Sequence, residues 1–540
     1  MSDWGATHST VAAALAGLDQ QMPDAGYFGA ALQAAVAAGT VPQSRVDDMV
    51  MRMLTPMFAL NLFTTGADPA QRNTSSYARS PAHDALALTL AESSITLLKN
   101  DGGFLPIPPA AMRRVAVFGD TDTISGGGSG GVVRPYVITP QQGIAALLNP
   151  GSPAQPTGSC PAPENDIDYN DQASNLAQVS AASPQDCCNS CAAYPGCSAW
   201  TLDAGACYLK SSASGRAAAA GRVSANLTNP SPAGGAVAVT YYSTQDPAAA
   251  AAAAAGADLI VMVVATDSSE GSDRTTLGFP AWQDALVAAL GAAGRLVVVA
   301  RCPGACTMPW AGSAAVPAIL YELLPGQESG NSIAATIFGE NNPSGKLPLT
   351  FPNPAPAGSQ FPTDTWLSPP GGGPVIPTAF PGTDRGRGFP EVDFAEELFM
   401  GYRWYDAQGT SPQWAFGHGL SYSTFNYSAL TIGGSVTPAA GATVFATICN
   451  TAGPAGAEVA QLYLGYPAAA NEPPKLLKGF EKLRLAPGEC SGVGFPLEAK
   501  DLWVWDVPSQ AWQLIPGSYT VMVGSGSRDI RLTGALTVTA

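Results

Sequence analysis

Short apolar runs that alternate with helical patterns constrain the fold of this chain more than any other feature. The strand-like runs, rich in Val, Leu and Ile, are residues 115–118, 259–264, 296–300 and 318–321. Helical patterns occupy residues 282–293 and 332–338. Because strands that alternate with helices typically form a parallel sheet with helices on its faces, we predict one α/β domain over residues 91–149 and 236–352.

A cysteine-rich segment at residues 150–235 interrupts this domain. Six of the ten cysteines lie in it, namely Cys160, Cys187, Cys188, Cys191, Cys197 and Cys207. Zinc is the competing interpretation of clustered cysteines. Disulfides are favoured, because the segment has no histidine and looks small and loop-rich. The cysteine spacing resembles an apple/PAN module, which implies either a carbohydrate or protein contact or a passive insertion.

The last part of the chain predicts a different architecture. Short alternating strands, separated by turn residues, fill residues 416–540 and indicate a β-sandwich. Residues 353–415 are predicted to be a loop-rich connection. Two further disulfides are expected, a local one between Cys302 and Cys306 and a second between Cys449 and Cys490 in the sandwich.

The first 63 residues contain amphipathic helical patterns without enough partner surface for a core of their own. In one of them Val46, Met49, Val50 and Met53 recur at helical spacing. A polar stretch rich in Ser, Thr and Asn follows, so residues 64–90 are predicted to be a linker.

Charge and hydropathy limit the partners of the chain. The net charge is −16, which argues against nucleic acid, since phosphate neutralisation needs clustered Lys and Arg. No uninterrupted apolar run reaches ~18 residues, so no membrane span is expected. The cysteines and the sequons at Asn73, Asn226 and Asn426 suggest secretion, although no signal peptide begins at Met1. We therefore interpret Met1 as an internal residue of a longer secreted protein.

Several segments, in order along the chain, resemble glycoside hydrolase family 3, the β-glucosidase family. They are Ser2–Gly5, Leu98–Gly102, Ser269–Arg274, Pro325–Glu328, Asn342–Pro348 and Phe416–Tyr422. The resemblance implies that residues 1–63 are the C-terminal remnant of a catalytic (β/α)₈ barrel, a fold that needs ~250 residues when complete. It also implies that the α/β domain is the second domain of the family and that residues 416–540 are its fibronectin type III-like domain.

The same resemblance implies two catalytic carboxylates. Asp3 would be the nucleophile and Glu270 the general acid/base of a retaining glycosidase. Trp4 would supply an apolar wall for one face of the sugar. The competing interpretations are that Asp3 caps the helix that follows it and that Glu270 forms a surface pair with Arg274. Asp273 is interpreted as a structural partner of Arg274.

Other motifs lack the context that their chemistry requires. The glycine-rich stretch 126–131 matches both a dinucleotide fingerprint and a nucleophile elbow, but residues 132–135 follow it instead of a helix. We expect a flexible loop near the site entrance there. Lys346 follows a glycine without the earlier glycine of a phosphate loop, and three histidines give little support to a Ser-His-Asp triad.

The expected activity is retaining exo-hydrolysis of terminal β-D-glucosyl residues from a β-glucoside or oligosaccharide, without metal or organic cofactor. In the family, the groups that bind the glucose hydroxyls come largely from earlier barrel strands, so the chain is expected to be inactive or weakly active. The alternative is a non-catalytic fragment or carbohydrate-contact protein. A β-xylosidase is a lesser alternative, because that branch of the family tends to carry Cys where this chain has Trp4.

Overall fold

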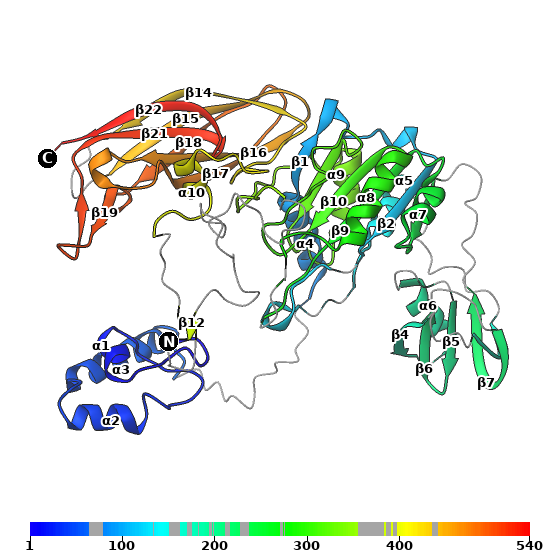
Figure 1. Ribbon diagram of the computed structural model, residues 1–540, viewed down its shortest axis with the longest axis horizontal. Coiled ribbons are helices and arrows are strands. Elements are labelled where there is room, and N and C mark those ends of the chain that lie inside the picture. The colour runs from blue at the N-terminus through cyan, green and yellow to red at the C-terminus, as the bar shows by residue number, and fades with distance from the viewer. Residues whose placement is uncertain are drawn as a thin grey trace. The chain divides into compact units, whose positions relative to one another are not determined.

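A computed structural model describes most of the 540-residue chain. The residues outside the description are 64–78, 122, 133, 135, 151–162, 170–174, 182, 194–196, 198, 211–215, 227–236, 271–273, 275, 355–382, 385–389, 392–396, 435–440 and 540. The chain divides into two compact units, Met1–Ser80 and Pro81–Ala540 (Figure 1).

A six-stranded sheet in the order β1-β11-β10-β9-β2-β8 forms the α/β domain of the second unit. The strands are β1 (Thr96–Asn100), β2 (Arg114–Gly119), β8 (Ala238–Tyr242), β9 (Leu259–Ala265), β10 (Leu296–Arg301) and β11 (Ala318–Glu322). The five strands from β11 to β8 run parallel, which confirms the predicted parallel arrangement for them. The edge strand β1 pairs antiparallel with β11, so the sheet as a whole is mixed.

Helices cover both faces of this sheet. They are α4 (Pro81–Ser94), α5 (Pro140–Leu148), α7 (Pro247–Ala254), α8 (Ala281–Ala293) and α9 (Ser329–Phe338). Val115 and Val117 of β2 share a core with α5 and α9, whereas Ala116 and Phe118 share the opposite core with α7 and α8 (Figure 1). Successive side chains of a strand point to opposite faces, so strands covered on both faces are apolar along their central residues.

The predicted helices 282–293 and 332–338 are confirmed as α8 and the later part of α9. The linker expected over residues 64–90 differs from the structure, because α4 begins at Pro81. Pro81 occupies the first helical position and Asp84 lies in the first turn, both of which favour a helix start. Local start signals and several alanines therefore outweigh the polar composition upstream.

The cysteine-rich insert forms an antiparallel sheet in the order β3-β7-β5-β6-β4. Its elements are β3 (Glu164–Tyr169), β4 (Asn175–Ser180), α6 (Pro184–Ala193), β5 (Ala199–Asp203), β6 (Ala206–Lys210) and β7 (Arg216–Asn226). Disulfides Cys187–Cys207 and Cys191–Cys197 lie within the insert, as predicted. Cys188 is also disulfide-bonded, and Cys160 lies outside the described residues. The apple/PAN resemblance stays a prediction.

Two packed sheets form the predicted C-terminal β-sandwich. One consists of β14 (Thr424–Gly433), β15 (Ala442–Ala452) and β18 (Cys490–Leu497), and the other of β17 (Leu476–Leu485), β16 (Gly456–Gly465), β21 (Gly517–Gly526) and β22 (Asp529–Val538). β19 (Trp503–Asp506) and β20 (Ala511–Leu514) form a separate two-stranded hairpin. The predicted disulfide Cys449–Cys490 is confirmed and joins β15 to β18.

The connection between the α/β domain and the sandwich contains little described structure. Helix α10 (Tyr402–Gln408) and the short pair β12 (Thr383–Asp384) and β13 (Pro390–Glu391) are its described elements. Much of the predicted loop-rich range 353–415 lies outside the described residues.

The described residues of the first unit contain three helices, namely α1 (Val11–Leu15), α2 (Ala30–Ala37) and α3 (Gln43–Ala59). Their small core consists of Ala14, Leu32, Ala35, Val41 and Met49. Many larger apolar side chains stay exposed, among them Met51, Met57, Phe58, Leu60, Leu62 and Phe63. This agrees with the expectation that 63 residues offer too little partner surface for a full core.

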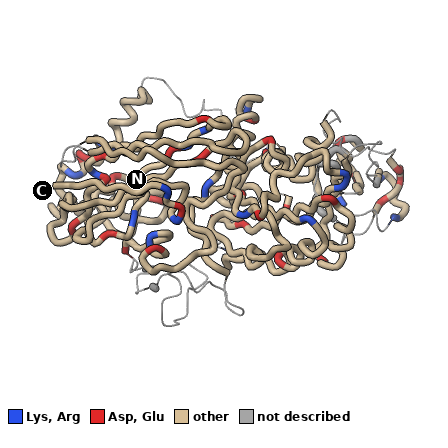
Figure 2. Tube along the Cα trace, turned by 90° about the horizontal axis from the view of Figure 1, so that it is seen from above, with Lys and Arg blue, Asp and Glu red and all other residues tan. Residues whose placement is uncertain are grey.

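Acidic and basic residues are interspersed along the described chain, and Figure 2 shows no segment of it that is basic throughout. Among the described residues no helix is long and apolar enough to cross a membrane.

Candidate active site

The carboxyl ends of the parallel strands lie along one edge of the sheet, where open α/β sheets present their reactive groups. Four of the segments that leave that edge frame the candidate site. They follow β2 at residues 120–131, β9 at 266–280, β10 at 302–306 and β11 at 323–328. Glu270, the predicted acid/base, lies in the loop after β9, as expected from the sequence.

The glycine-rich turn, residues 126–131, lies directly against Glu270. The Ser129 amide donates a hydrogen bond of 2.9 Å to Glu270 Oε2, and the Glu270 amide donates a longer one of 3.5 Å to Gly127 O. A parallel bridge pairs Gly127 with Ser269. Glu270 is exposed, and no hydrogen bond among the described residues engages its other carboxyl oxygen.

Close approach explains two of the glycines in this turn. A Cβ added to Gly127 would lie 2.7 Å from the Ser269 side chain, and one added to Gly128 would lie 2.5 Å from Glu270 Cβ. Gly128 also has a φ of +60°, which disfavours other residues. Among the described residues, no helix follows the short 3₁₀ segment Gly128–Gly130 before Pro140, so the dinucleotide and nucleophile-elbow contexts remain unmet. The sequence pattern predicted a loop here but not its contact with Glu270.

Arg274 turns away from Glu270. Its Nη2 donates to Ala305 O across 3.0 Å, inside the small ring closed by the confirmed disulfide Cys302–Cys306. No ion pair joins Glu270 to Arg274 in the described part of the chain, so the surface-pair interpretation is wrong. Burial lowers the pKa of Arg274. Asp273 lies outside the described residues, and its pairing with Arg274 stays a prediction.

A buried ionic cluster lies below the loops at the same edge. Arg301, the last residue of β10, donates from Nε to Glu322 Oε2 across 3.0 Å and from Nη1 to Asp120 Oδ1 across 3.1 Å. Ser329 Oγ also contacts Arg301 and donates to Glu322 Oε2. Burial raises the pKa of Glu322, and Arg301 opposes that rise. The cluster ties together the ends of β2, β10 and β11.

Sequence reasoning missed this cluster. Arg301 and Glu322 each follow an apolar run by one position, where a charged residue is usually interpreted as the exposed end of a strand. Arg301 and Glu322 carry opposite charges at the ends of two neighbouring parallel strands. This pattern in the sequence could have indicated that their side chains are in contact.

Asp3 and Trp4 belong to the first unit. Ser2 N donates to Gln20 O across 2.8 Å, and a parallel bridge pairs Trp4 with Met22. The segment around Asp3 therefore runs parallel to residues 20–22, with backbone pairing like that between neighbouring strands. Asp3 Oδ1 accepts a 2.7 Å hydrogen bond from the amide of Trp4, whose side chain is 74% exposed.

The helix-cap interpretation of Asp3 is wrong, because the N-cap of α1 is Thr10. Asp3 and Glu270 lie in different units of the chain, so their predicted proximity stays a prediction.

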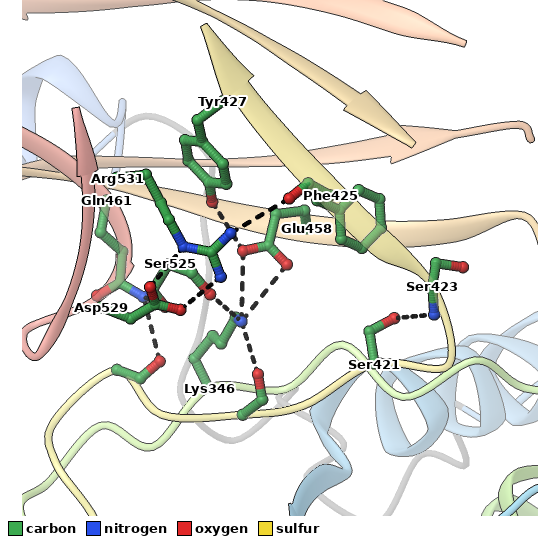
Figure 3. A network of polar contacts seen from close by, with 12 residues as sticks. Lys346, Ser421, Ser423, Phe425, Tyr427, Glu458, Gln461, Ser525, Asp529 and Arg531 are labelled. Carbon is green, nitrogen blue, oxygen red and sulfur yellow. Dashed lines mark hydrogen bonds and ion pairs between the residues drawn. The ribbon is translucent and has the colours of Figure 1, made fainter. Parts of the chain in front are cut away.

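Two of the family-like segments join the α/β domain to the sandwich instead of serving chemistry. Leu347 N donates to His418 O across 2.9 Å, and Gly417 N donates to Leu347 O across 2.8 Å. Figure 3 shows Lys346 reaching Glu458 and Ser525 of the sandwich, at 3.4 and 2.9 Å. A structural role for Lys346 agrees with the rejection of a phosphate loop.

His418 is part of the same junction. Its Nε2 lies 2.9 Å from Leu98 O, and burial lowers its pKa. Its ring is therefore engaged with the backbone of β1, which agrees with the rejection of a catalytic triad.

Comparison with known proteins extends these observations. Residues 95–422 match the glycosyl hydrolase family 3 C-terminal domain, and residues 458–527 match a fibronectin type III-like domain. The second match confirms the predicted nature of the sandwich.

Similar proteins include two curated relatives and two solved structures. A probable β-glucosidase L of Emericella nidulans is 33% identical over 100% of this chain and 66% of its own length. Its Aspergillus fumigatus counterpart is 32% identical with the same coverage. A β-D-glucoside glucohydrolase from Trichoderma reesei aligns with a TM-score of 0.69 at 28% identity, over 100% of this chain and 68% of its own. A Bifidobacterium adolescentis β-glucosidase gives 0.68 at 26%, over 100% of this chain and 64% of its own.

The chain thus spans just under two thirds of the curated relatives that it matches, 66% of their length. The family match covers residues 95–422 and includes the whole sheet edge that presents Glu270. On these grounds the chain belongs to glycosyl hydrolase family 3.

Proposed function

We propose that this chain carries the two carboxylates of a retaining β-glucosidase, Asp3 as the nucleophile and Glu270 as the general acid/base. One observation supports the proposal above all others. Glu270 is exposed in the loop after β9 at the carboxyl edge of the parallel sheet, and the Ser129 amide donates a hydrogen bond to one of its carboxyl oxygens. Relatives that align over the full length of the chain are named β-glucosidases.

The chemistry takes two steps. Asp3 attacks the anomeric carbon while Glu270 gives its proton to the departing glycosidic oxygen, and a covalent glucosyl-enzyme results. Glu270, now ionised, removes a proton from water, which attacks the same carbon and releases glucose with its configuration retained. The exposed ring of Trp4 would pack against the C–H face of the glucose ring.

We expect the 540-residue chain by itself to be weakly active or inactive. The chain spans 66% of the length of its relatives. A reaction catalysed by two carboxylates loses most of its rate when the groups that position the sugar are missing. If the chain is inactive, the alternative function is that of a non-catalytic fragment or carbohydrate-contact protein. A β-xyloside is the lesser substrate, since Trp4 rather than Cys follows the nucleophile.

The test compares two proteins. The first is the chain itself, and the second is the chain joined at its N-terminus to the residues of the Emericella nidulans relative that precede the aligned region, in which we expect the remainder of a barrel. The joined protein should hydrolyse aryl β-glucosides well above background and aryl β-xylosides poorly. Its Asp3→Ala and Glu270→Ala variants should lose several powers of ten in kcat/KM.

Azide identifies the two roles separately. Azide added to the Glu270→Ala variant should form β-glucosyl azide, because the glucosyl-enzyme is opened from the face that water normally uses. Azide added to the Asp3→Ala variant should form α-glucosyl azide, because it replaces the nucleophile itself. Full activity in either variant, or the reversed stereochemistry, would remove that residue from its proposed role.

We also infer that the protein is made in an oxidising, secretory compartment. Disulfides lie in the α/β domain, the insert and the sandwich, and Asn426 of the sequon on β14 is exposed. Expression in a secreting eukaryotic host should give a glycan whose mass disappears in the Asn426→Gln variant. An unmodified Asn426 in the wild-type chain would count against this location.

A further inference from the structure

We propose that the glycine-rich turn, residues 126–131, is the positioning element for the Glu270 carboxyl group and reserves Oε1 for the catalytic proton. The inference rests on the proposed acid/base role of Glu270 and extends it to residues that the family-like motifs do not include. It makes Gly128 and Ser129 positioning residues, which act on the glycosidic leaving group through Glu270.

The hydrogen bond to Glu270 decides which oxygen carries the proton. A backbone amide can only donate, and the Ser129 amide donates to Oε2 across 2.9 Å. A proton on Oε2 would compete with that amide, so in the neutral acid the proton resides on Oε1. When Oε1 gives its proton to the leaving group, the same amide stabilises the carboxylate that forms.

Steric contact fixes the position of the Glu270 backbone from the same side. Gly128 leaves no room for a side chain, because its Cβ would lie 2.5 Å from Glu270 Cβ. Gly127 is bridged to Ser269 and leaves equally little room. The turn therefore approaches the loop after β9 more closely than any residue with a side chain permits.

The base of the turn is fixed to the frame of the domain. Asp120 N donates to Val263 O of β9, and the Asp120 carboxylate accepts hydrogen bonds from Thr123 and from Arg301 of the buried cluster. Ile124 O accepts a 3.0 Å hydrogen bond from Gly326 N in the loop after β11. The buried cluster thus supports the start of the same loop whose tip holds Glu270.

The chain supplies matched variants for the test. Gly128→Ala introduces the collision with Glu270, whereas Gly130→Ala places its Cβ in open space within the same turn. Ser129→Pro removes the donating amide, whereas Ser129→Ala keeps it. Thermal melting of all four variants checks that each chain folds.

The first measurement is hydrogen–deuterium exchange of the 540-residue chain, which needs no activity. Uptake in the peptide that spans residues 266–276 should rise severalfold in Gly128→Ala and Ser129→Pro, and it should match wild type in the two control variants. Equal uptake in Gly128→Ala and Gly130→Ala would overturn the positioning role, whatever the activity of the protein.

The second measurement uses the joined protein with substrates of different leaving groups. For an alkyl β-glucoside, whose departure requires a proton, kcat/KM should fall at least ~10-fold in Gly128→Ala and Ser129→Pro. For 2,4-dinitrophenyl β-glucoside, whose leaving group departs without a proton, kcat/KM should stay within ~3-fold of wild type. A purely structural defect would lower both values together and would overturn the inference.

The Glu270→Gln variant separates this inference from the proposed function. If Glu270→Gln itself shows no leaving-group dependence, the acid/base assignment fails, while the exchange result still reports whether the turn holds the loop. If Glu270→Gln shows the dependence and Gly128→Ala does not, the assignment stands and the positioning role fails.

Discussion

Arg301 and Glu322 form a hydrogen-bonded ion pair of 3.0 Å at the ends of two neighbouring parallel strands, and both side chains are completely buried. A buried charge without its partner is costly to fold, so each residue depends on the other. Arg301→Met should therefore lower the free energy of unfolding by ~3–5 kcal/mol, measured by chemical denaturation. The double variant Arg301→Met with Glu322→Leu should recover a large part of this loss.

The pH dependence of Arg301→Met has a defined sign. Burial already raises the pKa of Glu322 in the folded protein, and loss of Arg301 raises it further. A carboxyl group whose pKa is raised in the folded state destabilises that state only when it is ionised. The loss in free energy of unfolding of the variant should therefore be smallest below pH ~4 and should grow toward neutral pH. A deficit that stays constant from pH 4 to 8 would show that the charge of Glu322 is not its cause.

His418 gives a second pH-dependent prediction. Burial lowers its pKa, although its contact with Leu98 O and the charge of Asp529 oppose the shift, and Lys346 favours it. The unfolded chain then takes up the proton first as the pH falls, so wild type should lose stability below pH ~6.5, by up to ~1.4 kcal/mol per pH unit. His418→Gln should lose this component of the slope between pH 6.5 and 5. An unchanged slope in the variant would assign it to other groups.

Sequence patterns predicted the frame of the domain because its physical cause is local. A strand covered by helices on both faces is apolar through its centre, so the sequence predicts β2, β9, β10 and β11 as strands of one parallel sheet. The antiparallel edge strand β1 is not marked in this way, because its direction depends on the pairing with β11 and not on its own residues. Helix α4 was missed in part because composition was averaged over a range that contains its start.

The candidate site was predictable only where a side chain carries the chemistry. The resemblance of its loop predicts Glu270, and this residue lies in the loop that follows β9 at the sheet edge. The Ser129 amide could not be found in this way, because every non-proline residue carries the same donor and only the fold directs it. The residues Arg301 and Glu322 were overlooked because burial of both charges depends on the side-by-side placement of β10 and β11.

The Cys302–Cys306 disulfide should matter for the loop after β9 more than for overall stability. It closes a ring of few residues, so its loss should cost at most ~2 kcal/mol. The ring presents Ala305 O to Arg274, which lies four positions beyond Glu270. The double variant Cys302→Ser, Cys306→Ser should therefore be cleaved faster by trypsin after Arg274, as followed by mass spectrometry. A comparable rise after Arg113 on the opposite side of the domain would indicate general unfolding instead.

The insert should be dispensable for folding of the α/β domain, because hydrogen bonds independent of it hold its two ends together. Asn149 follows α5 and Val237 precedes β8, and they are joined by Asn149 Nδ2 to Val237 O at 3.1 Å and by Val237 N to Asn149 Oδ1 at 2.8 Å. Replacing residues 151–235 by two or three glycines should leave the melting temperature within a few degrees of wild type. Asn149→Ala should destabilise the shortened chain by ~1–2 kcal/mol, because the bridging amide is lost. Failure of the shortened chain to fold would show that the insert contributes to the core of the domain.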